Sequence, residues 1–206
     1  MGGLDRTLRA AGLVAAAAAV ITLAASQAGA HERKPAEPNA LPAGDFGGPF
    51  VLVDHKGRMV TERTYLGLMQ VIYFGYTHCP DICPIDAANI AQAVDLLGPA
   101  AKEVQPLFIT IDPARDTAQR LSEWLGAIHP RFVGLTGPEH TVAAATKAFK
   151  VVYEKVETAN GYDYAVAHPG LIYVIDRDGH FLFLLPPGTP PEVIAEELRA
   201  ALDDQG

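Results

Sequence analysis

A pair of cysteines constrains this chain most, because the two lie four positions apart in a loop that directly follows a strand pattern. Residues 71–74 are a continuous run of β-branched and aromatic residues, which predicts a strand buried on both faces. The Gly, Pro and Asp residues of segment 75–84 predict the loop that leaves its carboxyl end. Open α/β sheets bind ligands at that edge. The position of Cys79 and Cys83, the chain's only cysteines, therefore predicts the functional site.

The first 30 residues differ from the rest and predict a secretory signal peptide. Arg6 and Arg9 precede a charge-free run at residues 11–25, and small residues at 28–30 supply a cleavage site after Ala30. The run is shorter than the ~18 residues expected of a spanning helix. Cleavage is therefore expected, and an uncleaved membrane anchor through residues 11–25 is the alternative.

Charge and cysteine count exclude two further classes of protein. Cleavage removes Asp5, Arg6 and Arg9, so 16 basic and 24 acidic residues become 14 and 23, a net charge of −9. Such acidity argues against nucleic acid as a partner. The chain is 49% hydrophobic and 19% charged, which is typical of a globular protein with one core. Two cysteines are too few for a disulfide framework, so the pair must act locally.

The remainder predicts a Pro/Gly-rich tether at residues 31–49 and one domain at residues 50–206. The expected elements are a hairpin around 55–57, a strand from Val71, a helix from Pro84, a strand at 107–111, helices opened by Asp116 and by Gly137-Pro138, strand patterns at 151–156, 171–175 and 181–185 with turns at 160–161 and 178–179, and a last helix capped by Thr189. This order predicts a single thioredoxin-like α/β domain, with a central mixed sheet flanked by helices and an N-terminal hairpin.

Each cysteine directly precedes a proline, and a residue before proline is disfavoured in the α conformation. Cys79 is therefore expected in the loop and Cys83 at the N-cap, with Pro84 at the first helical position. The unpaired amides of a helix start favour a thiolate. Such a pair can form an inert stabilising disulfide, act as a redox couple, or hold a soft metal ion, and the spacing alone leaves these three open.

A third ligand would favour the metal, and His168 is the strongest candidate of the seven histidines. It immediately precedes a strongly apolar strand pattern, in a loop that a thioredoxin-like fold would bring toward Cys79. His78 adjoins Cys79, but from an extended loop its side chain would point elsewhere. His31, at the predicted mature N-terminus, could bind Cu(II) only incidentally. Surface positions are expected for His55, His129, His140 and His180.

Three segments of the sequence together match the motifs of a known family, and they occur in the same order as in that family. They are residues 73–84 with both cysteines, residues 111–117 with the sequence Asp-Pro-x-Arg-Asp, and His168 followed by residues 173–176. A loop at 187–191 follows them. Together they resemble the Sco/SenC family of copper chaperones over about residues 46–203. The resemblance implies a thioredoxin-like fold, export to the periplasm and one copper ion held by Cys79, Cys83 and His168. Two thiolates and an imidazole suit Cu(I), whereas zinc usually takes a fourth ligand.

Members of the family help to assemble the dinuclear copper centre in subunit II of cytochrome c oxidase. Some act instead as thiol-disulfide oxidoreductases that reduce the cysteines of that subunit. The implied cofactor is copper, as Cu(I) or Cu(II), and the implied partners are subunit II or another copper protein and a periplasmic copper donor. The resemblance also implies that Cys79 and Cys83 are redox-active and close as a disulfide when oxidised.

The sequence departs from the family at two positions. Ala167 and Pro169 replace the usual Asp and Ser on either side of the ligand histidine, and lost outer-shell contacts can weaken a metal site about 10 to 100-fold. Asp112 is a candidate for part of that shell, while Arg115 and Asp116 are expected to fix their loop and cap the next helix.

Two rival functions remain to be compared with copper binding. A cis-proline at Pro169 would favour an oxidoreductase, because thioredoxin-fold oxidoreductases place a cis-proline near their dithiol. An imidazole that faces both sulfurs would favour the chaperone. A peroxidase is the least favoured class, because Cys83 would have to resolve the sulfenic acid.

Overall fold

The computed structural model describes residues 46–158 and 163–205. The predicted signal segment 1–30, most of the predicted tether 31–49, His31 and the predicted turn at 160–161 therefore lie outside the described residues. Within the described ranges, no helix is long and apolar enough to cross a membrane.

Among the described residues, seven strands form one mixed sheet, in the order β2-β1-β5-β4-β3-β8-β9. Their bounds are Val51–Asp54 (β1), Met59–Thr61 (β2), Met69–Gly75 (β3), Val104–Thr110 (β4), Val133–Thr136 (β5), Ile172–Ile175 (β8) and Phe181–Leu185 (β9). Strands β3, β4 and β5 are parallel, while β1 and β8 join them antiparallel. The N-terminal hairpin is confirmed as β1–β2, and the last hairpin as β8–β9.

Strand β3 lies near the centre of the sheet, and every one of its residues is buried. The apolar run 71–74 that predicts it pairs in register with β4 on one side and β8 on the other. Burial of both faces explains why this strand has a continuous apolar pattern instead of an alternating one. The strand ends at Gly75, directly before the cysteine loop.

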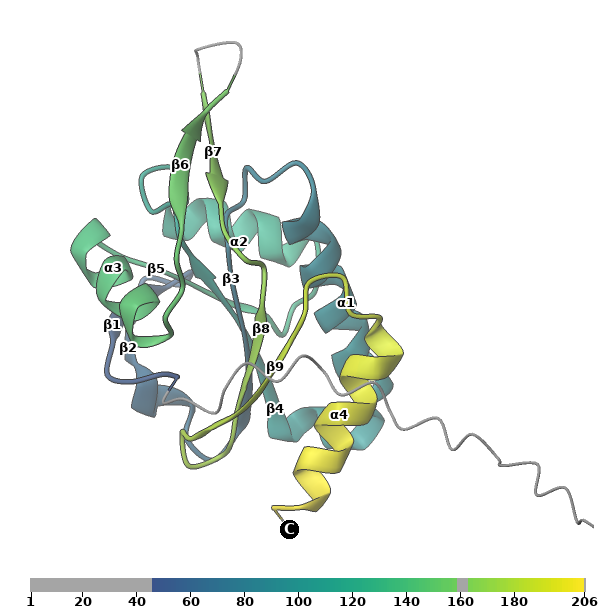
Figure 1. Cartoon of the computed structure of the whole chain (residues 1–206). Coiled ribbons are helices and arrows are strands. Elements are labelled where there is room, and N and C mark those ends of the chain that lie inside the picture. Colours follow the sequence, from purple (N-terminus) through teal and green to yellow (C-terminus); the bar gives the residue numbers. More distant parts are fainter. Residues whose placement is uncertain (1–45, 159–162, 206) are drawn as a thin grey trace, which may run out of the picture. The chain divides into compact units, whose positions relative to one another are not determined.

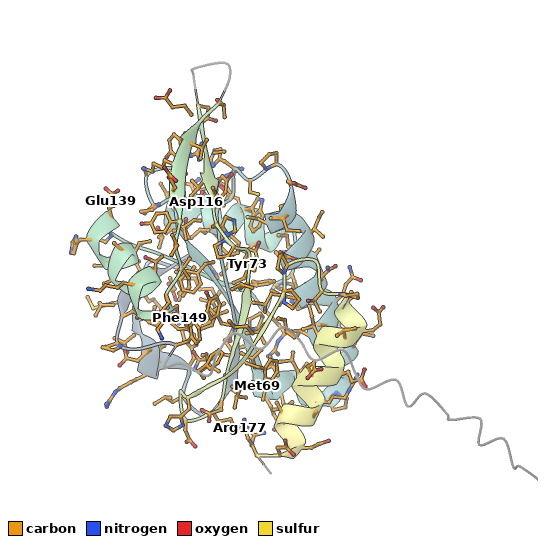
Figure 2. The ribbon with its side chains drawn as sticks, in the orientation of Figure 1. Met69, Tyr73, Asp116, Glu139, Phe149 and Arg177 are labelled. Carbon is orange, nitrogen blue, oxygen red and sulfur yellow. The ribbon has the colours of Figure 1, made fainter. Side chains whose placement is uncertain are left out.

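In the described part of the chain, four α-helices cover the sheet: α1 (Ile82–Leu96), α2 (Ala118–Gly126), α3 (Glu139–Ala148) and α4 (Pro191–Asp203), with short 3-10 helices at Glu62–Tyr65 and Gly98–Glu103. Figure 1 shows α1 and α4 on one side of the sheet and α3 on the other. The architecture confirms the predicted single thioredoxin-like domain of helices around a mixed sheet. In Figure 2, Tyr73 and Phe149 lie in the interior, and Arg177 lies at the opposite end of the domain from Asp116.

Strands β6 (Glu154–Glu157) and β7 (Tyr164–Ala167) form a separate two-stranded hairpin. The strand pattern at 151–156 predicts β6 in part, but β7 is an element that the sequence analysis does not predict. The hairpin projects past the end of the sheet at which β3 leads into α1 (Figure 1). It leads directly to His168, so its position helps to determine where that ring lies.

The start of α1 differs from the prediction. The helix begins at Ile82 with Asp81 as its N-cap, so Cys83 lies inside the first turn instead of at the cap. Pro84 is tolerated there because the amides of the first turn have no partner within the helix.

The predicted caps of two other helices are also wrong. The Thr117 side chain caps α2 in place of Asp116. The Thr189 hydroxyl does not cap α4 but donates to the Pro186 carbonyl at 2.6 Å.

Candidate metal centre

Cys83 and His168 are 85 positions apart in the chain, and the fold brings them into contact. The His168 Nε2 atom lies 3.4 Å from the Cys83 sulfur. Cys83 faces the core from the first turn of α1, whereas His168 lies on the loop between β7 and β8. The fold therefore brings together two of the three predicted ligands.

Cys79 lies in the preceding loop, where its amide donates to the Tyr76 carbonyl at 3.2 Å. Both cysteines are free thiols, with Cys79 partly exposed and Cys83 buried. Among the described residues, only Asp176, Asp178 and His180 bring three potential ligand atoms within 4.8 Å of one another. The three predicted ligand groups must therefore come closer together before they can hold one ion.

The environment of Cys83 keeps its thiol protonated. Burial raises the pKa of the thiol, and the Tyr76 backbone amide offsets this effect only in part. The Cys79 thiol nearby raises the pKa further. The predicted lowering of the pKa by the helix start is thus wrong, because loss of hydration outweighs it. A metal ion bound by this sulfur must displace a proton.

The His168 imidazole is held as a neutral ring. Burial lowers the pKa of His168, and the Gly170 amide donates to its Nδ1 atom at 3.2 Å. The rings of Tyr73 and Tyr76 meet the imidazole edge-on, each with a centroid separation of 6.2 Å. Neutral imidazole is the form that binds metals. A backbone amide and two aromatic rings therefore orient this histidine without the acidic neighbour usual in the family.

Asp116 fixes the loop that carries the cysteines. Its buried carboxylate accepts hydrogen bonds from the Thr77 amide at 3.0 Å, the Thr77 hydroxyl at 2.6 Å and the Thr110 hydroxyl at 2.7 Å. Thr77 is two residues from Cys79. The prediction that Asp116 fixes its loop is confirmed, but its side chain holds the neighbouring cysteine loop instead of capping α2.

Asp112 and Arg115 contact the hairpin that carries His168. The Tyr164 hydroxyl donates to Asp112 Oδ1 at 2.6 Å, and the Arg115 guanidinium donates to the other oxygen of the same carboxylate. Arg115 also donates to the Tyr164 carbonyl at 3.0 Å. Both His168 nitrogens have other partners, so Asp112 reaches the predicted ligand only through the hairpin. Neither Tyr164 nor Thr77 is predicted as a site residue, although both lie close to the motifs that are.

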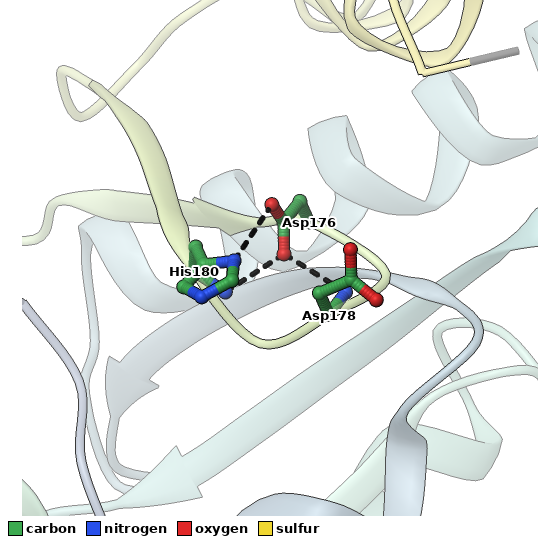
Figure 3. A group of neighbouring side chains, drawn as sticks. All are labelled: Asp176, Asp178 and His180. Carbon is green, nitrogen blue, oxygen red and sulfur yellow. Dashed lines mark hydrogen bonds and ion pairs between the residues drawn. The ribbon is translucent and has the colours of Figure 1, made fainter.

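Other histidines contact groups outside the candidate centre. His78 Nδ1 lies 3.1 Å from the Thr77 hydroxyl, and the half-buried His55 accepts the Gly134 amide at 2.9 Å. Figure 3 shows His180 with Asp176 and Asp178 in the β8–β9 turn. Asp176 Oδ1 accepts the amides of both 178 and 180, which is the hydrogen bonding of a turn-forming aspartate.

The candidate centre therefore offers two thiols and one neutral imidazole at the edge of the sheet. This donor set suits a soft ion such as Cu(I). Its partly exposed member, Cys79, leaves the centre accessible from solvent.

The comparisons with known proteins all indicate the same family. The SCO1/SenC family model matches residues 38–203. Protein SenC of Rhodobacter capsulatus is 37% identical over 158 residues, which are 77% of this chain and 71% of that protein. The mitochondrial SCO1 homolog of Homo sapiens is 40% identical over 139 residues, 66% of this chain and 46% of that protein. The match thus spans less than half of the human relative.

Solved structures agree with the fold. Bradyrhizobium japonicum ScoI with copper bound is 37% identical, with a TM-score of 0.70 over 75% of this chain and 98% of that one. Yeast Sco1 with copper bound is 35% identical, with a TM-score of 0.71 over 78% of this chain and 90% of that one.

Proposed function

Because the chain belongs to the SCO1/SenC family, we propose that it is a copper chaperone in which Cys79, Cys83 and His168 together hold one copper ion. The observation that carries the proposal is the approach of His168 Nε2 to within 3.4 Å of the Cys83 sulfur. Copper-bound relatives of 35% and 37% identity support the choice of metal.

Copper is the cargo of this protein, and the residues differ in what they contribute to its exchange. The buried Cys83 and the half-buried His168 are already in contact within the fold. Cys79, in the more exposed loop, completes the site and offers the sulfur that an incoming donor or outgoing acceptor reaches first. Binding releases the Cys83 proton. The neutral His168 ring loses no net proton, but for copper to bind Nε2 the ring proton must move to Nδ1, which then no longer accepts the Gly170 amide.

The recipient we propose is subunit II of cytochrome c oxidase, whose dinuclear copper centre would receive the ion, and the donor is a periplasmic copper protein. Localisation to the periplasm follows from the predicted signal segment at residues 1–30. Cell fractionation with an antibody to this chain tests the localisation. Recovery in the cytoplasm would contradict it.

A Cu(I) titration of the reduced full chain tests the proposal, with a chromophoric Cu(I) chelator as competitor. We expect one tightly bound equivalent, and a loss of affinity of more than about 100-fold in Cys79→Ala, Cys83→Ala and His168→Ala, beyond the range for outer-shell contacts. His78→Ala, which removes the imidazole adjacent to Cys79, is the matched control and should bind as the wild type does.

The alternative is a thiol-disulfide oxidoreductase that reduces the recipient's cysteines with the same dithiol. In that reaction the partly exposed Cys79 would attack the substrate disulfide, and the buried Cys83 would resolve the mixed disulfide. Weak copper binding that is indifferent to His168→Ala, together with reduction of a disulfide substrate, would favour this alternative.

A further inference from the structure

The position of His168 depends on a hairpin that lies outside the main sheet. Strand β7 pairs only with β6 among the strands described, with Ala167 opposite Glu154 and Tyr164 opposite Glu157. The Val166 side chain is 3% exposed and anchors the base of the hairpin in the core. The rest of the hairpin must be oriented by side-chain contacts, and these lie at the opposite end of β7 from His168.

Arg115 makes most of these contacts from the loop after β4. Its guanidinium lies 3.8 Å from the centre of the Tyr164 ring and 5.6 Å from that of Tyr76. It also forms ion pairs with Asp112 and with Asp163, the residue before β7. Only 16% of the Arg115 side chain is exposed. A planar guanidinium is suited to stacking and to several directed hydrogen bonds at once, which lysine cannot reproduce.

Tyr164, on the hairpin, contacts both Asp112 and Arg115. Its hydroxyl donates to Asp112 Oδ1 at 2.6 Å, while its carbonyl accepts from Arg115 Nη1 at 3.0 Å. The Asp112 carboxylate, with no exposed surface, accepts from both residues. Four positions further along, Asp116 holds the cysteine loop through Thr77. One short turn therefore fixes both halves of the candidate metal centre.

We infer that Arg115, Tyr164 and Asp112 form a latch that positions His168 against Cys83, and that opening it turns a three-ligand copper site into a two-thiol site. These are positioning residues, and the inference rests on the proposed function. When the latch opens, the hairpin turns about the buried Val166 and carries the imidazole away from the sulfur. The dithiol keeps its own support, because Asp116 binds the cysteine loop independently.

A copper-free measurement tests the latch directly: nuclear Overhauser contacts between the His168 ring and the Tyr73 and Tyr76 rings in the reduced full chain. We expect these contacts in the wild type and their loss in Arg115→Gln. Arg177→Gln is the matched control, because it breaks an ion pair with Glu103 at the other end of the domain (Figure 2). Contacts of wild-type strength in a folded Arg115→Gln protein would overturn the inference.

Two milder variants keep the test decisive if Arg115→Gln does not fold. Arg115→Lys preserves the charge without the planar group, and Tyr164→Phe preserves the ring without the hydroxyl. Both should weaken the ring contacts of His168 partially. If both folded variants keep them unchanged, the latch does not exist.

Copper affinity then provides the second readout. Arg115→Gln should lower Cu(I) affinity about 10 to 100-fold, and the double variant with His168→Ala should lose no more than His168→Ala alone. The midpoint potential of the Cys79–Cys83 pair should stay at the wild-type value, which general unfolding would not allow. Additive losses in the double variant would contradict the latch. Failure of the wild type to bind copper would instead refute the proposed function, and the copper-free contacts would still decide the latch.

Discussion

The two halves of the candidate metal centre are supported in opposite ways. The cysteine half follows a fully buried strand and is held by the buried Asp116 carboxylate, which accepts three hydrogen bonds. The histidine half follows a two-stranded hairpin whose β6 is exposed along its whole length. The comparison indicates a cysteine loop held by a buried carboxylate and an imidazole that depends on contacts near the surface. A protein that must take up and release copper can use that difference, because one ligand can leave without disturbing the core.

Removal of the Asp116 carboxylate should have the largest effect. Asp116→Ala leaves the Thr77 amide and two threonine hydroxyls without their acceptor, so we expect a loss of about 3–5 kcal/mol in the free energy of unfolding. Urea denaturation of the reduced protein measures it. Asp81→Ala, at an exposed N-cap that makes no side-chain cap bond, is the control and should change stability by less than about 0.5 kcal/mol. Equal effects in the two variants would mean that the cysteine loop does not rely on Asp116.

A methyl group at Gly75 should disturb the dithiol half next most. It would lie 2.7 Å from Tyr73 Cε1 and 3.1 Å from the Cys83 sulfur. We expect Gly75→Ala to cost about 1–3 kcal/mol, as overpacked cores do. Gly126→Ala places the same methyl in open space at the end of α2 and should be neutral or slightly stabilising. Thermal unfolding compares the two, and a neutral Gly75→Ala would show that the strand end is loosely packed.

The two thiols should react at different rates in the copper-free protein. Cys79 is partly exposed, whereas Cys83 is buried and its pKa is raised by that burial. Iodoacetamide at neutral pH should therefore modify Cys79 at least about tenfold faster, since the thiolate is the reactive form. Because the raised pKa keeps Cys83 protonated, its rate should climb with pH toward alkaline values. Mass spectrometry of peptides reports both rates, and comparable rates at neutral pH would contradict the buried environment of Cys83.

The smallest expected effect concerns the hairpin alone. Tyr164→Phe loses one hydrogen bond to Asp112, worth about 0.5–1.5 kcal/mol. Amides of β7 should exchange with solvent a few-fold to tenfold faster, while those of β3 keep wild-type protection. Tyr153→Phe, which removes a hydroxyl just before β6, is the matched control. Faster exchange throughout the sheet would mean that the hairpin and the core do not open separately.

The sequence predicts the dithiol half better than the histidine half, for a physical reason. An apolar run such as 71–74 reports burial on both faces, and a loop rich in Gly and Pro reports the end of a strand. Strand β7 has only four residues, and two of them are alanine, which is depleted in strands, so it leaves no comparable pattern. His168 itself is predicted from its place before an apolar strand and from the family motif.

The contacts made by single side chains are the part that sequence does not predict. Asp116 precedes a helix and resembles a cap, yet the adjacent Thr117 performs that role, and the carboxylate turns toward Thr77. Cys83 lies at a helix start, where a low pKa is expected, but its burial reverses the direction. Both outcomes depend on tertiary neighbours that local spacing cannot specify.

X-ray absorption at the copper edge of the Cu(I)-loaded full chain tests the central claim most directly. The account predicts two sulfur ligands and one imidazole nitrogen in the wild type, and two sulfurs without imidazole scattering in His168→Ala. A wild-type spectrum with sulfur ligands alone, identical to that of His168→Ala, would contradict it.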